Sequence, residues 1–133
     1  MDYCTDDGRN LIQEWYAAQD DAVKVAFDAT LFTLAATEDW EAASVQEFKV
    51  LTERHAGLGE IRFDVEAKEP GWKKPRKRRF RPVGIWHPGE REFILLLGCE
   101  KSGRIYTPLN AFDLALEYKA QFEQGRGTIR EHA

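Results

Sequence analysis

The chain has 133 residues, of which 43% are hydrophobic and 32% are charged, and this composition is typical of one folded domain rather than of a disordered chain. Its longest apolar run is far shorter than a membrane span, and its N-terminus lacks the basic and apolar regions of an export signal, so we expect a cytoplasmic protein without membrane contact. Cys4 and Cys99 have no metal-ligand spacing and are expected to be reduced thiols, and we expect neither a metal nor a cofactor.

The formal net charge of −4 is divided unevenly along the chain. Residues 1–56 contain 12 acidic and 4 basic residues, whereas residues 57–133 contain 11 acidic and 15 basic residues. A basic half favours a polyanionic partner. An acidic helical face beside an ordinary basic loop explains the same numbers equally well.

Two amphipathic helices are predicted near the N-terminus, after a very short strand that ends at Cys4. Asn10 is a suitable N-cap for the first helix, residues 11–19. Apolar residues spaced three or four apart predict the second helix, which runs from residue 20 to about residue 36. The short connection between the two predicts an antiparallel helical hairpin.

The periodicity then changes from helical to strand-like. Val45, Phe48 and Leu51 recur at helical spacing and predict a short helical turn under the sheet. Residues 60–67 alternate apolar and charged side chains, which predicts a half-buried strand. Arg62 is expected on the open face of that strand.

A dense basic segment follows at residues 68–81, with the sequence KEPGWKKPRKRRFR. Its prolines and glycine predict a long hairpin tip, with the next strand entering near Arg79. Basic charge interleaved with Trp72 and Phe80 suits phosphate binding with base stacking, whereas a solubilising loop is the alternative. The candidate RNA-binding residues are Lys73, Lys74, Arg76, Lys77, Arg78 and Arg79.

The most apolar segment, residues 93–97 with the sequence FILLL, predicts a central strand buried on both faces, next to a strand at residues 81–87. A last helix is expected from about residue 109, followed by a polar, frayed tail at residues 125–133. The order predicts an α+β fold, in which an N-terminal helical hairpin and a C-terminal helix accompany a small antiparallel sheet. We expect a single domain over residues 1–133 with a basic hairpin insertion at residues 68–81.

The motifs of these elements, taken together, resemble those of a known family. The segments are GLGEIRFDV, FRPVGIW and EFILLLGCEKSGRIYTP, followed by an alanine-containing helix and preceded by DDGRNLIQEWY. In this order they are similar to the RelE/HigB superfamily of type II toxin–antitoxin toxins, and most of all to its phage-derived HigB-like branch. The resemblance covers roughly residues 3–122. It implies a RelE-like fold, with two helices packed on an antiparallel sheet.

The resemblance also implies an activity. Members of this superfamily are metal-independent endoribonucleases that cut messenger RNA in the ribosomal A site and inhibit growth. A cognate antitoxin, often a helix-turn-helix protein, neutralises each toxin. The RNA's own 2′-hydroxyl attacks the adjacent phosphate, which requires a base, cations for the developing charge and a proton donor for the leaving oxygen.

Four residues match the family's motifs at positions that the resemblance implies are catalytic. Arg62 matches the basic residue of the "E-[LI]-R" strand, and Arg81 matches the arginine of "[YF]-R"; both side chains suit bidentate phosphate binding. Lys101 matches the first lysine of the "K-K" pair and is a candidate charge stabiliser or base. Tyr106 precedes the last helix and is a candidate for stacking on a base.

The sequence leaves other functions open. The family is usually basic, whereas this chain is acidic overall, and Ser102 stands where the family has its second lysine. A non-catalytic module that binds RNA or protein on the same fold is therefore the alternative, and a structural prophage protein is a third. His87 is either an acid or base of the site or an ordinary residue before a turn.

Overall fold

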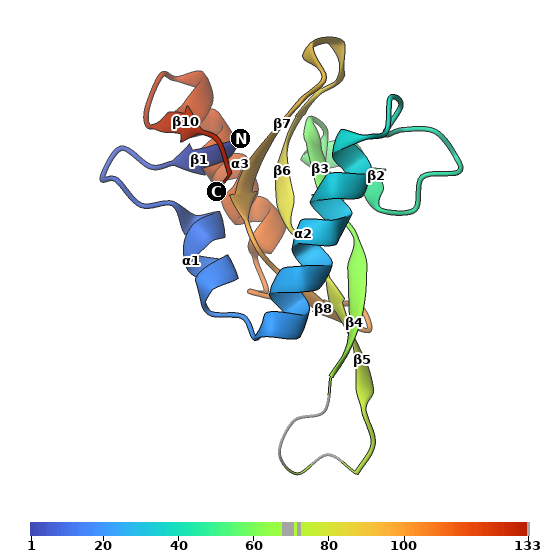
Figure 1. The fold of residues 1–133 in the computed structure, drawn as a ribbon. Coiled ribbons are helices and arrows are strands. Elements are labelled where there is room, and N and C mark those ends of the chain that lie inside the picture. The colour runs from blue at the N-terminus through green and yellow to red at the C-terminus, as the bar shows by residue number, and fades with distance from the viewer. Residues whose placement is uncertain (68–70, 72, 133) are drawn as a thin grey trace.

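The computed structural model describes residues 1–67, 71 and 73–132, and these form a mixed α+β fold with two β-sheets (Figure 1). The strand order of sheet A is β10-β1-β7-β6-β3-β2, and that of sheet B is β4-β5-β8-β9. The strands of sheet A are β1 (Asp2–Cys4), β2 (Phe48–Val50), β3 (Leu58–Ile61), β6 (Val83–His87), β7 (Glu92–Leu97) and β10 (Thr128–Arg130). The strands of sheet B are β4 (Phe63–Ala67), β5 (Arg76–Phe80), β8 (Glu100–Ser102) and β9 (Ile105–Thr107). The helices are α1 (Leu11–Ala17), α2 (Asp21–Ala35) and α3 (Ala111–Glu123), with 3₁₀ turns η1 (Glu53–His55) and η2 (Pro88–Glu90).

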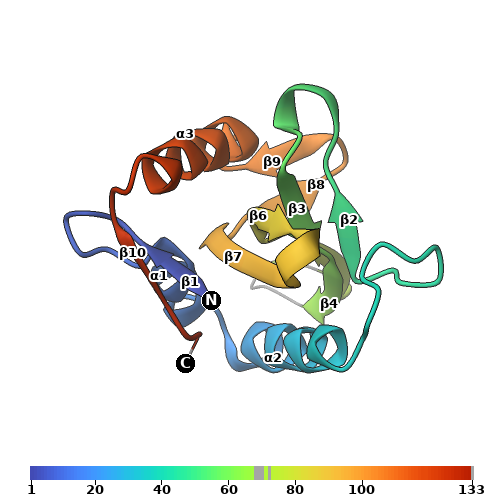
Figure 2. The ribbon, with the colours of Figure 1, turned by 90° about the horizontal axis from the view of Figure 1, so that it is seen from above.

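Sheet A lies between helices on both of its faces (Figure 2). Helix α3 packs on β6 and β7 from one side, and α1 packs on β1 and β7 from the other, where α2 also covers β4. The side chains of β7 alternate between the two cores. Ile94 and Leu96 belong to the α3-side cluster, whereas Phe93 and Leu95 belong to the α1/α2-side cluster. The prediction of a central strand buried on both faces is therefore confirmed.

The two N-terminal helices begin where their capping residues predict. The Asn10 side chain accepts a hydrogen bond from the Gln13 backbone N–H at 3.0 Å, and Asp20 accepts one from the Val23 N–H at 3.0 Å. Each bond satisfies a donor that the first helical turn leaves without a backbone partner.

The predicted helical turn at residues 45–51 is wrong, because this segment contains strand β2. Phe48 pairs with Ile61 of β3 in an antiparallel register. The Phe48 ring lies directly on Gly59, where an added Cβ would be 2.4 Å from the ring, and it also packs against Trp86 with the ring centroids 5.0 Å apart. The pairing with β3 and the aromatic packing stabilise an extended backbone in spite of the helical spacing.

The prediction of a frayed C-terminal tail is also wrong. Strand β10 pairs with β1 in antiparallel register, with Tyr3 opposite Ile129. His132 Nδ1 lies 2.9 Å from the buried carboxylate of Asp2. Polar composition alone predicted fraying, whereas the exposed edge of β1 provides backbone partners that a local pattern does not reveal.

The strands of sheet B are the other departure from the predicted elements. Strand β5 already begins at Arg76 rather than near Arg79, and β8 and β9 form a short hairpin where only a polar strand exit was expected. The two sheets together are therefore larger than the predicted meander. Among the described residues, no helix combines the length and the apolar character needed to cross a membrane.

Candidate functional site

Three segments of the chain run from one sheet into the other, and the strand in each of them is interrupted at the same level, where sheet A meets sheet B. Arg62 separates β3 from β4, Arg81 and Pro82 separate β5 from β6, and Gly98 and Cys99 separate β7 from β8. The backbone stays hydrogen bonded across this level, because the Arg81 N–H donates to the Cys99 carbonyl at 2.8 Å. Proline has no N–H for a regular ladder, which is one reason why the strands break here.

Gly98 is a second reason for the break. An added Cβ at Gly98 would lie 2.1 Å from the Trp15 side chain, so the α1 tryptophan packs directly on the backbone at this point. Beyond Gly98 the chain leaves the doubly covered sheet A and enters sheet B. On the α3 side of sheet B the side chains of Lys77 and Arg79 are exposed.

Glu60 lies at this junction and is a buried carboxylate, with 2% of its surface exposed. Arg62 Nε lies 3.4 Å from Glu60 Oε1, and the Tyr106 hydroxyl donates to Glu60 Oε2 at 3.5 Å. Burial raises the pKa of Glu60 above its ordinary value. Four cations oppose that shift by favouring the charged carboxylate, namely Arg62, Arg81, Lys49 and Lys101.

Tyr106 and Cys99 border the same carboxylate. Burial, followed by the charge of Glu60, raises the pKa of Tyr106 to about 12, so its hydroxyl stays protonated at neutral pH. The same two causes raise the pKa of Cys99 to about 12, and its thiol donates to the Arg81 carbonyl. A buried protonated thiol is a poor nucleophile, so Cys99 has a packing role here.

One row of side chains crosses sheet B from edge to edge. Asp64 on β4 pairs with Arg79 on β5, Arg79 pairs with Lys101 on β8, and Lys101 pairs with Tyr106 on β9. Residues directly opposite each other on neighbouring strands lie on the same face of a sheet. The Lys101 ammonium accordingly lies 5.4 Å from the centroid of the Tyr106 ring. The row therefore consists of a carboxylate, two cations and an aromatic ring.

Arg81 is the most buried of the predicted phosphate ligands, with 7% of its surface exposed. Its Nη1 donates to the Phe80 carbonyl at 2.7 Å, to the Phe63 carbonyl at 3.3 Å and to Asp64 Oδ1 at 3.2 Å. Its buried Nε has no hydrogen-bond partner. A buried donor without an acceptor is unfavourable by about 1–3 kcal/mol, so the Arg81 guanidinium retains capacity for an anionic ligand, whereas the Arg62 Nε already lies beside the Glu60 carboxylate.

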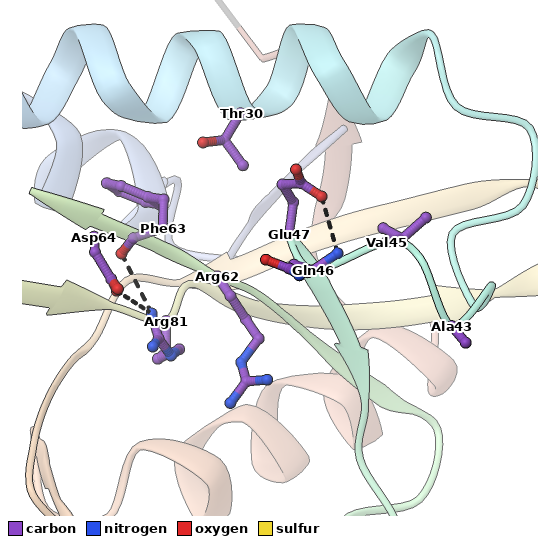
Figure 3. Close-up of a pocket in the computed structure, with 9 residues that line it drawn as sticks. All are labelled: Thr30, Ala43, Val45, Gln46, Glu47, Arg62, Phe63, Asp64 and Arg81. Atoms are coloured by element: carbon purple, nitrogen blue, oxygen red, sulfur yellow. Dashed lines mark hydrogen bonds and ion pairs between the residues drawn. The ribbon is translucent and has the colours of Figure 1, made fainter.

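These two arginines line the largest described cavity, which has a volume of about 680 Å³ (Figure 3). Helix α2 and the segment before β2 form its other walls. In Figure 3 both arginine side chains extend away from α2. The full lining comprises Thr30, Ala43, Val45, Gln46, Glu47, Arg62, Phe63, Asp64 and Arg81.

Of the four residues predicted to be catalytic, Arg62 and Tyr106 thus contact Glu60, and the charges of Arg81 and Lys101 act on it. The predicted RNA-binding residues, in contrast, lie in three different places. Lys77 and Arg79 share the face of Lys101, because they alternate with Arg78 along β5. Arg76 and Arg78 lie on the opposite face, where Arg78 forms a bidentate pair with Glu100 at 2.6 and 2.9 Å. The remaining two, Lys73 and Lys74, lie near the hairpin tip and line a separate cavity there. Trp72, the predicted stacking residue, lies outside the described residues.

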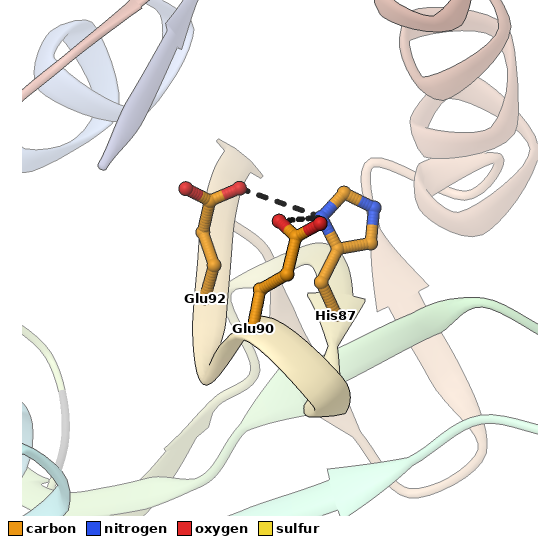
Figure 4. A group of neighbouring side chains, drawn as sticks. All are labelled: His87, Glu90 and Glu92. Carbon is orange, nitrogen blue, oxygen red and sulfur yellow. Dashed lines mark hydrogen bonds and ion pairs between the residues drawn. The ribbon is translucent and has the colours of Figure 1, made fainter.

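His87, the last residue of β6, lies beside Glu90 and Glu92 (Figure 4) and at the far end of the strand from this site. Glu60 pairs with Val83, so His87 is four residues further along the strand, about 13 Å away at the usual rise per residue. His87 Nδ1 lies 3.4 Å from Glu92 Oε1 and 4.0 Å from Glu90 Oε2. Within the described residues, His87, Glu90 and Glu92 are the one group whose ligand atoms are close enough to one another to hold a metal ion, and exposed acidic groups commonly cluster in this way without one.

Glu60 is the functional candidate that sequence reasoning missed. The period-two pattern placed its side chain among the open, polar positions of the strand. A signal was nevertheless available, because Glu60 and Arg62 are two residues apart and must share a face in a strand. Only the tertiary fold shows that Arg81 and Lys101 approach the same carboxylate.

Comparisons of the chain with protein-family models, with curated proteins and with solved structures found no match.

Proposed function

We propose that the protein is a metal-independent endoribonuclease of the RelE/HigB toxin type, with the RelE-like fold. One observation carries the proposal: the buried Glu60 carboxylate has Arg62, Arg81, Lys101 and Tyr106 around it. This set contains a base, cations and a proton donor, which are the three components that cleavage by an internal 2′-hydroxyl requires. The similarity of the strand motifs to this family supports the same function.

In the proposed reaction Glu60 accepts the proton of the 2′-hydroxyl as the 2′-oxygen forms a bond to phosphorus. A carboxylate with a raised pKa is a stronger base than an ordinary glutamate, which suits this role near neutral pH. Arg62 and Arg81 bind the non-bridging phosphate oxygens, and the buried Nε of Arg81, which has no acceptor within the protein, is free to donate to one of them. The bond from phosphorus to the 5′-oxygen breaks, leaving a 2′,3′-cyclic phosphate.

The leaving 5′-oxygen needs a proton, and we assign its donation to the Tyr106 hydroxyl. With its pKa raised to about 12, its hydroxyl remains protonated at neutral pH and can transfer the proton to the more basic alkoxide. Lys101 stabilises the negative charge that accumulates on the phosphorane oxygens. No step in this scheme requires a metal ion.

The proposal includes the biological setting that the resemblance implies. The substrate is messenger RNA in the ribosomal A site, the regulator is a cognate antitoxin, and the compartment is the cytoplasm. The test uses ribosomes programmed with a messenger RNA, with mapping of the new RNA ends. We expect cleavage that disappears when the nucleotide at the cut carries a 2′-deoxyribose, and growth arrest when the protein is expressed in bacteria. Intact messenger RNA together with normal growth would contradict the proposal.

A non-catalytic RNA-binding module is the second candidate. The observation that favours it is the contrast between Arg81, which is buried and already paired with Asp64 at 3.2 Å, and Lys77 and Arg79, which are exposed. A buried, paired arginine is less available to a reacting phosphate, whereas exposed cations on β5 can still bind an RNA backbone. RNA binding without new RNA ends in the ribosome assay would identify this second function.

A further inference from the structure

The β4–β5 hairpin projects beyond the helices (Figure 1). The register of its two strands gives its two faces different side chains. On the α3-side face, Lys77 and Arg79 alternate along β5 and lead to Arg81 at the site. We call these three residues the cationic track. Side chains two residues apart on one strand lie about 6.6 Å from each other, which is comparable with the spacing of successive phosphates along one RNA strand.

The strands on either side of β5 make the track asymmetric. On β4, Asp64 and Glu66 lie opposite Arg79 and Lys77, so this edge repels phosphate groups. On the other side Lys101 and then Tyr106 follow, across β8 and β9. A polyanion that follows β5 is therefore displaced from β4 toward β8.

Tyr106 is a half-buried aromatic residue at the end of this row, packed on one side against Phe112 of α3 with the ring centroids 4.6 Å apart. Two strand spacings separate β5 from β9, about 10 Å in all, which is within the reach of a nucleotide from its phosphate to the far edge of its base. A cationic groove beside an aromatic ring is the usual arrangement for binding single-stranded nucleic acid. The track on β5 therefore suits the phosphate backbone of a bound RNA strand, and the β8–β9 side suits its bases.

We propose that the cationic track binds one single RNA strand, with successive phosphates at Lys77, Arg79 and Arg81 and with the bases directed across β8 toward Tyr106. The proposal deepens the ribonuclease function, on which it rests for the position of the cut near Glu60. It also assigns no phosphate contact on this strand to Arg76 or Arg78, which lie on the opposite face.

The test measures binding of single-stranded 2′-O-methyl RNA, which cannot be cut, by fluorescence anisotropy over a series of salt concentrations. For an octanucleotide we expect Lys77→Ala and Arg79→Ala each to lower the slope of log Kd against log salt by about 0.7, the value for one phosphate contact on a single strand. Arg76→Ala is the matched control. It removes the same charge from the opposite face of β5 and is expected to leave the slope unchanged.

Oligonucleotide length provides the second readout. A dinucleotide at the site has no phosphate for Lys77, so wild type and Lys77→Ala should bind it equally, whereas the octanucleotide should distinguish them. If Arg76→Ala lowered the slope as much as Arg79→Ala, or if the wild type bound no RNA at low salt, the proposed track would be wrong. Far-UV circular dichroism of each variant excludes unfolding as the cause of lost binding.

The results distinguish a failure of the proposed cationic track from a failure of the proposed nuclease function. Face-specific binding of the uncleavable RNA, without cutting of messenger RNA on ribosomes, would retain the track and reject the nuclease. Ribosomal cleavage, with slopes that are the same for all variants, would retain the nuclease and reject the track.

Discussion

Sheet A and sheet B are built from the same continuous chain segments, but their surroundings differ. Sheet A has α3 on one face and α1 on the other, so the β7 side chains from Phe93 to Leu97 are buried. Sheet B carries charged and aromatic side chains on its α3 side, and Ile105 of β9 is 59% exposed. The comparison indicates that sheet A supplies most of the stability, whereas sheet B supplies the side chains available to a ligand.

Glu60 lies at the boundary between the two sheets. Its side chain is buried, as are the side chains of β7 in sheet A, but it also forms an ion pair with Arg62, as charged side chains in sheet B do. A rigid, doubly covered sheet fixes the backbone that carries it. Beyond the strand breaks at Arg62, Arg81 and Gly98 lies sheet B, where Lys77 and Arg79 of β5 are exposed. Chemistry at the edge of a rigid core combines precise positioning with access for a substrate.

The largest effect is expected at this boundary. Glu60→Gln keeps the shape of the side chain and removes the proposed base, so we expect cleavage of messenger RNA on ribosomes to fall by about 10²–10⁴-fold. The measurement is the rate at which new RNA ends appear in single-turnover reactions.

Glu90→Gln is the matched control, since it removes an exposed carboxylate from η2, beside His87 at the far end of β6 from the cation cluster. We expect near wild-type cleavage for it. Equal rates for Glu60→Gln and wild type would mean that Glu60 has no role in proton transfer.

The contrast between the sheets predicts different stability effects for two apolar truncations. Leu96→Ala, at a fully buried position of sheet A, is expected to lower the free energy of unfolding by about 2–5 kcal/mol. Ile105→Ala, at an exposed position of sheet B, is expected to change it by less than about 0.5 kcal/mol. Urea unfolding followed by tryptophan fluorescence measures both. Similar losses for the two variants would refute the division of roles.

Substitutions at two glycines test the same difference between sheet A and sheet B, and their expected effects on stability are smaller. Gly98→Ala places a methyl group against Trp15 and is expected to destabilise by about 1–3 kcal/mol through overpacking. Gly103, in the β8–β9 turn, has a φ of 60° and open space around its Cα, so Gly103→Ala is expected to add only backbone strain of about 1 kcal/mol. Thermal unfolding measures the two shifts, and a larger shift for Gly103→Ala would contradict the packing argument.

The smallest effect expected is a pH dependence of stability that comes from Glu60. Its pKa is raised in the folded protein, so the stabilisation it gives is complete below its ordinary pKa near 4.5 and is lost as the pH rises through the higher folded value. Glu60→Gln does not titrate. The unfolding free energy of the wild type relative to this variant should therefore decrease with rising pH in that window.

Denaturant unfolding of both proteins at a series of pH values measures this difference, and subtraction removes the contributions of the other carboxyl groups. A difference that increases with pH would mean that the surrounding cations outweigh burial at Glu60.

The elements that could be predicted from the sequence are those with long, regular patterns. The capped helices α1 and α2 and the buried strand β7 follow from local side-chain chemistry. The elements that could not be predicted are short ones with distant partners. Strand β10 needs β1 and β8 needs β5, and in both pairs the two strands are far apart in the sequence. Strand β2 is close to its partner β3 in the sequence, but its extended backbone also depends on the packing of Phe48 against Trp86.

The candidate site divides in the same way. The resemblance to toxin motifs indicated Arg62, Arg81, Lys101 and Tyr106, and these residues do lie together in the fold. It gave no indication that Glu60 is the carboxylate they share, nor that β5 divides the predicted RNA-binding residues between two faces. The basic residues of this segment cannot be assigned to one face of the sheet or the other until the register of β5 with β4 and β8 is known.

By itself, then, the sequence determined an α+β chain with two N-terminal helices, an apolar central strand and a concentrated basic segment, because these depend on neighbours within a few turns or residues. The tertiary structure alone decided that three strands break at one level, that Glu60 is buried there among cations, and that Lys77 and Arg79 face the same side as Lys101. Those features depend on strand register and on burial between distant segments, and both arise only when the whole chain packs.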